Sequence, residues 1–257
     1  MEVELTNREF RRYQKHIALP EIGKEGQQKI KTAKVLVIGV GGIGAPLLQY
    51  LCAMGIGTIG IVEHDLVSED NLQRQILYGD KDVGKLKTII SKQNLENKNS
   101  FVDLKVINLK FNKQNAFKII EDYEIIIDAT DNFSTRYLIN DTCIAKKKIL
   151  VYGSVYKYEG QVSVFNYKNG PSLRCLYPEI PQNKQIVNPD GVGITGVLSG
   201  MAGVIMANEV IKIITGYGEV LSGKLLIFDC RNYSQYITCI TKNPANFELR
   251  DIEGVDY

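Results

Sequence analysis

The residues with the clearest chemical meaning form a glycine-rich run, Gly39-Val40-Gly41-Gly42-Ile43-Gly44. The run follows a short apolar segment and opens a helical pattern, which is the context that a phosphate-binding G-x-G-x-x-G turn requires. Glycines permit a tight turn and a close backbone approach, and the start of a helix offers unpaired N–H groups to a phosphate. Glu63 ends the next apolar segment, near the distance where an acid contacts a ribose hydroxyl. The pattern predicts nucleotide binding, and taken alone its default ligand is NAD.

A second group of polar side chains follows the predicted strand ends: Asn71, Arg74, Lys87, Asp131 and Asn132. Because the carboxyl ends of parallel strands meet at one crevice of a doubly wound sheet, we expect these side chains to lie together. Two cations and a free carboxylate suit a triphosphate and a Mg²⁺ ion, whereas a dinucleotide needs neither. Each charge taken alone is typical of a solvated surface. Their joint placement favours Mg·ATP over NAD.

The elements that position these residues are read from the periodicity of apolar side chains. Short β-branched runs predict strands, and helical spacing between them indicates a parallel α/β sheet. The later strands lack crossover helices of the early kind. The expected strands are 34–38, 58–62, 101–107, 124–128, 148–152, 160–166 and 224–229, and the expected helices are about 43–54, 85–97, 113–121, 134–145 and one that ends near 214.

The sequence therefore predicts an α/β fold, a Rossmann-like domain with a mixed, mainly parallel sheet flanked by helices and an antiparallel C-terminal part. We expect one domain over residues 1–257, with the nucleotide-binding part at about 30–155. A crossover stretch of about 176–195 lacks periodicity. Such a stretch is typical of a functional loop, although a surface insertion would look the same.

The composition excludes several classes of protein. The 257 residues carry 31 lysines and arginines against 29 aspartates and glutamates, and the net charge of +2 predicts no nucleic acid and no membrane as partner. Five cysteines without a C-x-x-C pair indicate a reducing compartment. The polar N-terminus predicts no signal peptide, and the least polar stretch, 196–206, is too short to span a bilayer. These features predict a soluble, cytoplasmic protein.

Together, the motifs resemble those of the ThiF/MoeB/HesA family of adenylyltransferases, bacterial relatives of the ubiquitin-activating enzymes. The resemblance extends from Arg12 to about Asp229 and includes GVGGIG at 39–44, DNLQRQ at 70–75 and ATDNFSTR at 129–136. It implies that the protein binds Mg·ATP and adenylates the C-terminal glycine of a ubiquitin-like sulfur-carrier protein of the thiamine or molybdopterin type, releasing pyrophosphate. It also implies a homodimer and an external sulfur donor.

The resemblance assigns roles to individual residues. Gly42 lies in the phosphate loop, Glu63 matches the ribose-binding acid, and Asp131 matches the carboxylate that binds Mg²⁺. The remaining matches are polyphosphate contacts at Asn71, Arg74 and Lys87, a nucleotide-pocket residue at Asn132, and a cation that reaches across the dimer to the partner's ATP, at Lys15. A C-terminal carboxylate is already ionised at neutral pH, so the reaction needs no general base and no enzyme nucleophile. Positioning and charge neutralisation on the phosphates then carry catalysis.

The sequence departs from the family pattern in ways that change these expectations. Glu63 replaces an aspartate with a side chain one methylene longer, and Lys15 replaces an arginine and so loses the bidentate fork. The two C-x-x-C pairs of a zinc site are absent, because 172–175 reads SLRC and 243–249 reads NPANFEL. We therefore expect no zinc.

Cysteine usage predicts that no covalent thioester forms between enzyme and carrier. Val192 stands where relatives carry a cysteine, and Cys175, which precedes the crossover stretch, is the one remaining candidate nucleophile, with a buried packing role as the alternative. Three other functions stay open. They are adenylation of another carboxylate (a peptide natural product or a tRNA-linked one), a nucleotide-binding scaffold without turnover, and an NAD-dependent oxidoreductase.

Overall fold

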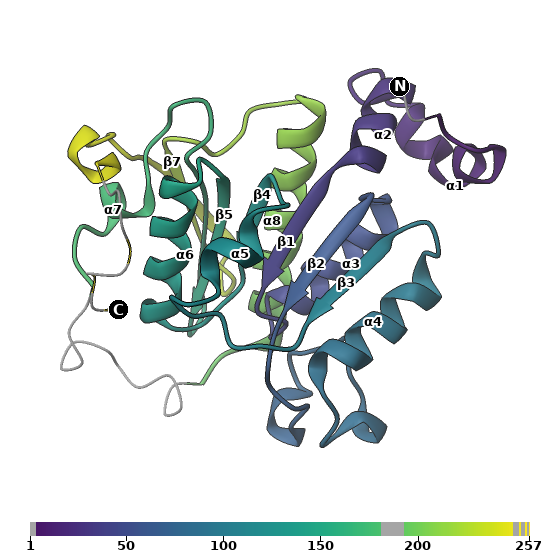
Figure 1. Cartoon of the computed structure of the whole chain (residues 1–257), viewed down its shortest axis with the longest axis horizontal. Helices are drawn as coiled ribbons and strands as arrows, with labels where there is room; N and C mark the ends of the chain where they lie inside the picture. Colours follow the sequence, from purple (N-terminus) through teal and green to yellow (C-terminus); the bar gives the residue numbers. More distant parts are fainter. Residues whose placement is uncertain (1–3, 181–192, 249–251, 253–254, 256) are drawn as a thin grey trace.

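A computed structural model describes residues 4–180, 193–248, 252, 255 and 257, which contain an eight-stranded sheet with helices on both faces (Figure 1). The strand order is β3-β2-β1-β4-β5-β6-β7-β8. The chain leaves β1 toward β2 on one side and returns to β4 on the other, so a topological switch point lies between β1 and β4. In such sheets ligands bind in the crevice outside the carboxyl ends of the strands at this point.

The first five strands run parallel: β1 Lys34–Ile38, β2 Thr58–Val62, β3 Asp103–Ile107, β4 Ile125–Asp128 and β5 Ile149–Tyr156. The sequence of β4, IIID, is buried at every position because helices cover both faces of the sheet, and this explains why the strand is apolar without alternation. The prediction is confirmed for all five strands, although β3 starts two residues later and β5 ends four residues later than expected.

The helices divide between the two faces of the sheet. One apolar cluster joins the sheet to α2 Gly23–Thr32, α3 Gly44–Met54, α4 Lys87–Lys98 and α8 Gly196–Thr215. The second cluster joins the opposite face to α5 Ala116–Ile120 and α6 Phe133–Ala145. The predicted helices are confirmed, with α5 shorter than the expected 113–121. Four short elements complete these connections: η1 Glu69–Asn71, η2 Asp80–Asp82, α7 Leu173–Leu176 and η4 Pro244–Phe247.

The C-terminal part of the sheet is antiparallel, as predicted, and consists of β6 Glu159–Phe165, β7 Lys224–Asp229 and β8 Ser234–Cys239 beside β5. The sequence did not predict β8. This strand forms the edge of the sheet, and its residues Gln235 to Cys239 are all exposed, so its sequence carries no alternation of buried and exposed residues.

Two N-terminal helices, α1 Asn7–Ile17 and α2, were also not predicted. Helix α1 begins with a capping box, in which Thr6 and Glu9 hydrogen-bond to each other's main-chain N–H. Its buried Tyr13 packs on Gly55, the residue that ends α3, and accepts a hydrogen bond from Asn99 at 2.9 Å. Helix α1 therefore lies at the opposite end of α3 from the glycine loop (Figure 1).

Helix α8 extends beyond the apolar stretch 196–206. With 20 residues, the helix is long and apolar enough, by length and composition alone, to cross a membrane. Half of its most apolar window is buried within the fold. Leu198, Ala202 and Met206 are fully buried in the cluster with α3, and the buried Glu209 pairs with Lys212 at 2.6 Å. These contacts make α8 a core helix of this sheet. Of the predicted crossover stretch, about 176–195, residues 181–192, including Val192, lie outside the described residues.

Candidate functional site

The glycine loop, residues 39–44, connects β1 to α3 at the switch point. Gly39 has a φ of 93°, a conformation that favours glycine, and a Cβ there would lie 2.7 Å from the carbonyl oxygen of Ala129, just after β4. Glu63 ends β2, and its Oε2 accepts a hydrogen bond from the N–H of Val40 at 3.0 Å. Glu63 therefore holds the loop against β2, which the sequence did not predict. Its contact with a ribose stays a prediction.

The start of α3 leaves main-chain donors available to an anion. Within the described part of the chain, the N–H groups of Gly41, Gly42 and Ile43 have no hydrogen-bond acceptor. Helix α3 has 11 residues, and the positive end of its dipole lies at this loop. Unpaired N–H groups at a helix N-terminus are the donors that phosphates bind.

Arg74 and Asn71 lie beside the loop. A Cβ on Gly42 would be 3.4 Å from Cδ of Arg74, and one on Gly41 would be 3.7 Å from Nε2 of Gln75. Asn71 Oδ1 accepts hydrogen bonds from Gln75 Nε2 and, at 3.4 Å, from an Nη of Arg74. These bonds orient the two predicted polyphosphate contacts next to the glycine loop. Gln75, which is 3% exposed, is a site residue that sequence reasoning missed although it ends the DNLQRQ motif.

The start of α8 packs against the glycine loop. A Cβ on Gly42 would lie 2.9 Å from Oγ of Ser199, and one on Gly196 would lie 3.2 Å from Cα of Arg74. Ser199 is buried. Residues far apart in the sequence therefore pack around the glycine loop. A glycine at position 42 is required by this close packing as well as by any ligand.

Lys87 is the first residue of α4 and is 4% exposed. Its Nζ lies 3.3 Å from Oδ2 of Asp65, and its N–H donates to the carbonyl of Asp65 at 3.0 Å. Potential metal-ligand atoms of Glu63, His64 and Asp65 lie within 4.8 Å of one another. However, both carboxylate oxygens of Glu63 already accept main-chain hydrogen bonds, and Asp65 pairs with Lys87. We therefore assign no metal to this group.

Asp131 lies in the turn between β4 and α6, against Gly39. Its carboxylate is exposed and makes no hydrogen bond or ion pair with the rest of the described chain. The turn itself is fixed, because the N–H and hydroxyl of Thr130 donate to Asp128 Oδ1 at 2.9 and 2.6 Å. Asn132 is the N-cap of α6, where its Oδ1 accepts from the N–H of Thr135 at 2.9 Å. A free carboxylate is an oxygen ligand of the kind that Mg²⁺ takes, and the unpaired N–H groups of the loop and the neighbouring Arg74 fit phosphates.

A buried ion pair, which was not predicted, lies next to this turn. Arg136 Nε lies 3.2 Å from Asp128 Oδ2, and both side chains are buried. Arg136 also donates to the carbonyl oxygens of Thr130 and Gly153 at 2.7 and 3.4 Å and to the hydroxyl of Tyr152 at 3.2 Å. Burial raises the pKa of Asp128, while the Arg136 charge and the bonds from Thr130 act in the opposite direction.

Lys15 is the one predicted site residue that lies away from the others. It is exposed on α1, two residues after Tyr13, which packs at the far end of α3. Helix α3 is roughly 16 Å long at 1.5 Å per residue, so Lys15 does not reach the glycine loop of its own chain.

The comparison with known families fits this geometry. The sequence profile of the ThiF family matches residues 13–247. The chain belongs to the ThiF family. It is 39% identical over 261 residues to the sulfur carrier protein adenylyltransferase of Thermus thermophilus, covering 98% of this chain and 96% of that protein.

Other relatives of this ThiF-family chain are longer. The probable adenylyltransferase/sulfurtransferase MoeZ of Mycobacterium tuberculosis is 40% identical over 258 residues, and the match covers 98% of this chain but only 65% of MoeZ. Among solved structures, E. coli MccB with ATP superposes with a TM-score of 0.80 at 22% identity, covering 95% of this chain and 74% of MccB. At that identity the likeness shows the fold alone.

The two segments that lack the zinc cysteines of the family pattern, 172–175 and 243–249, meet at Cys175. Its Sγ accepts hydrogen bonds from the N–H groups of Ser172 and Asn243 at 3.4 and 3.3 Å and from Nδ2 of Asn246 at 3.6 Å. Burial raises the pKa of this thiol, but these donors outweigh burial and lower it overall. The neighbouring Arg174 binds Asp141 at 2.7 Å. One thiol, one hydroxyl and two amides do not fit a structural zinc site.

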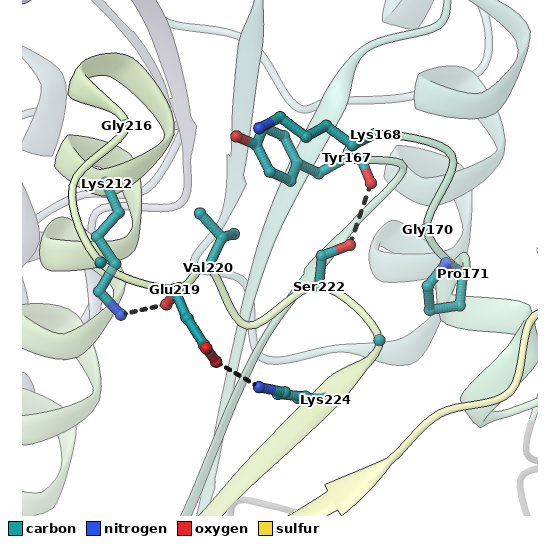
Figure 2. A pocket seen from close by; sticks show the side chains of 12 residues that line it. Tyr167, Lys168, Gly170, Pro171, Lys212, Gly216, Glu219, Val220, Ser222 and Lys224 are labelled. Atoms are coloured by element: carbon teal, nitrogen blue, oxygen red, sulfur yellow. Dashed lines mark hydrogen bonds and ion pairs between the residues drawn. The ribbon is translucent and has the colours of Figure 1, made fainter.

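A hollow of about 450 Å³ lies away from the nucleotide site, between the end of β6 and the start of β7 (Figure 2). Its cations are paired, since Lys224 binds Glu219 at 2.7 Å and Lys212 donates to the Glu219 carbonyl at 2.9 Å. Lys168 lies over the Tyr167 ring. The hollow therefore offers no unpaired charge to a ligand and takes no part in the site.

Proposed function

We propose that this chain catalyses the ATP-dependent adenylation of the C-terminal glycine of a ubiquitin-like sulfur-carrier protein, with release of pyrophosphate. The observation that carries the proposal is a glycine loop with unpaired N–H groups that has Arg74 on one side and, on the other, the turn that carries the free Asp131 carboxylate. The names of the relatives, sulfur carrier protein adenylyltransferase and MoeZ, support the choice of acceptor.

The chemistry follows from the residues at hand. A carboxylate oxygen of the carrier attacks the α-phosphorus of ATP, and the bond between that phosphorus and the bridging oxygen of pyrophosphate breaks. The carrier is already ionised, so no proton transfer is needed. Arg74, Lys87 and the N–H groups of the loop neutralise the charge that develops on the phosphates. Asp131 would hold a Mg²⁺ ion, which when bound offsets phosphate charge.

The remaining contacts are part of the same proposal. Glu63 accepts from the ribose hydroxyls with the lone pairs that its main-chain bonds leave free, and Asn71 and Asn132 line the nucleotide pocket. The adenylate then passes to an external sulfur donor without a thioester on the enzyme. The proposal includes no structural zinc, a single domain and a cytoplasmic location.

Lys15 serves the site of a second copy in a homodimer. It lies too far from its own glycine loop, and α1 borders an apolar groove of about 480 Å³ between α3 and α8. The groove is lined by Leu19, Tyr50 and Val204, which are 50%, 52% and 39% exposed. Large exposed apolar side chains that gather in one groove are typical of an interface. A second copy seated here would cover them and bring Lys15 toward the partner's nucleotide.

The test is isotope exchange between pyrophosphate and ATP, with and without candidate carriers from the thiamine and molybdopterin pathways. We expect exchange only with a carrier that ends in glycine. Asp131→Asn removes a charge and lowers the rate by on the order of 10² to 10³. Exchange that is supported by a short peptide alone would favour a peptide acceptor, and the absence of exchange with every acceptor would favour a scaffold without turnover.

A further inference from the structure

Asp131 owes its position to main-chain atoms, because its side chain forms no hydrogen bond or ion pair with the described residues. Since the peptide unit is planar, fixing the carbonyl of Thr130 also fixes the N–H and Cα of Asp131. That carbonyl accepts a hydrogen bond from Arg136 Nη2 at 2.7 Å. On the other side of Asp131, the carbonyl of Asn132 accepts from the main-chain N–H of Arg136 at 3.2 Å. The Arg136 side chain therefore holds the chain before Asp131, while the first main-chain bond of α6 holds it after Asp131.

The rest of the Arg136 side chain ties this turn to two strands. Its guanidinium reaches Asp128 at the end of β4 and the Tyr152 hydroxyl and Gly153 carbonyl on β5. Asp128 and Tyr152 are register partners, so the contacts join neighbouring strands at one level of the sheet. Asp128 in turn holds the N–H and hydroxyl of Thr130. Both residues of the ion pair therefore bond to the turn, Arg136 through the carbonyl of Thr130 and Asp128 through the N–H and hydroxyl of Thr130.

Stability alone does not account for such a pair. Removing two charges from water costs about as much as or more than their attraction returns, and buried pairs are often replaced by apolar residues without loss. Nε of Arg136 and Oδ2 of Asp128 lie 3.2 Å apart without forming an aligned hydrogen bond. The shortest hydrogen bond of the Arg136 side chain, at 2.7 Å, is the one to the Thr130 carbonyl, which indicates that the arrangement serves the turn.

We infer that Arg136, supported by Asp128, is the positioning residue that sets the Asp131 carboxylate for a divalent cation bound with the nucleotide. This inference rests on the proposed function of Asp131. A residue that positions a metal ligand changes metal affinity by about 10- to 100-fold when it is replaced. It does so without touching the nucleotide, so binding of the nucleotide in the absence of metal stays unchanged.

The test measures binding of α,β-methylene ATP by calorimetry, once with MgCl₂ and once with EDTA. The variant Asp128→Asn/Arg136→Gln neutralises both charges together and so leaves no buried unpaired charge. We expect its affinity with Mg²⁺ to fall about 10- to 100-fold and its affinity in EDTA to match the wild type. The matched control is Asp141→Asn/Arg174→Gln, a second ion pair of α6 that does not contact the turn, and it should leave both affinities unchanged.

A double-mutant cycle with Asp131→Asn decides whether the pair acts through Asp131. If it does, Asp131→Asn alone removes the gain from Mg²⁺, and adding the pair variant causes no further loss. Losses that multiply in the combined variant, or equal losses with Mg²⁺ and EDTA, would overturn the inference. If Asp131→Asn keeps the full gain from Mg²⁺, Asp131 binds no metal, and this proposed role fails together with the inference.

A second variant tests the inference if Asp128→Asn/Arg136→Gln does not fold. Arg136→Lys keeps a positive charge beside Asp128 but cannot reach Thr130, Tyr152 and Gly153 together. We expect the same selective loss with Mg²⁺ for this variant. An affinity equal to that of the wild type in both conditions would overturn the inference.

Discussion

Gly42 offers a direct test of how the site is packed. An added Cβ would lie 2.9 Å from Oγ and 3.0 Å from Cβ of Ser199, with Arg74 next at 3.4 Å. Both shorter distances are to a single side chain at the start of α8, so Gly42→Ala forces α8 away from the loop. Overpacking of this kind costs about 1–3 kcal/mol. For a chain of this length, a loss of about 2 kcal/mol lowers the Tm by about 4–8 °C.

The measurement is a thermal-unfolding cycle with Ser199→Gly. In that background the methyl group of Gly42→Ala meets no close neighbour except Arg74, so we expect the substitution to cost less than about 0.5 kcal/mol. Gly41→Ala is the matched control, because its nearest atom would be 3.7 Å away, an ordinary contact. It should keep the Tm and weaken ATP binding, since the methyl group faces the unpaired N–H groups. An equal cost of Gly42→Ala in both backgrounds would refute the packing.

Three further predictions concern the dimer and Cys175. Mixing inactive Lys15→Ala with inactive Asp131→Ala should restore partial exchange activity through hybrid dimers, and no recovery despite proven subunit exchange would mean that each site is complete within one chain. Metal analysis of the purified protein should find no stoichiometric zinc, and one zinc per chain would reveal ligands outside the donor set around Cys175. The lowered pKa of Cys175 predicts that its alkylation has a midpoint below pH 9.0 and that Asn246→Ala, which removes one donor, moves this midpoint upward. An unchanged midpoint would remove Asn246 from the control of this thiol.

The parallel half of the fold was predictable because its central strands β1, β2 and β4 carry continuous apolar runs. The runs KVLVI and TIGIV are covered on both faces of the sheet, so their apolar composition alone indicates buried strands. The first helix and the edge strand could not be found in this way. Helix α1 buries few apolar residues and so lacks a clear apolar pattern, although its Thr6-x-x-Glu9 capping box is typical of a helix start. Strand β8 has almost no buried residue and therefore no pattern.

The candidate site, like the fold, could be predicted only in part. The glycine loop could be read from the sequence because only glycine tolerates a φ of 93° against the Ala129 carbonyl. The partners of these residues could not. Glu63 bonds to Val40 across 23 positions, and Arg136 pairs with Asp128 through the fold of one turn, in a helix whose other residues are mostly apolar and buried. Such contacts depend on the final distances between elements, which a pattern of residue types does not contain.

The central claim, that this ThiF-family chain joins AMP to the C-terminal glycine of a carrier protein, is tested most directly by detecting that product. Wild-type enzyme, Mg·ATP and a carrier should be incubated with pyrophosphatase, which removes the second product and draws the reaction forward. Mass spectrometry of the intact carrier is then expected to show one added AMP, located on the terminal glycine, and Asp131→Asn should form this product on the order of 10² to 10³ times more slowly. A carrier that keeps its original mass while the enzyme binds ATP normally would contradict the account.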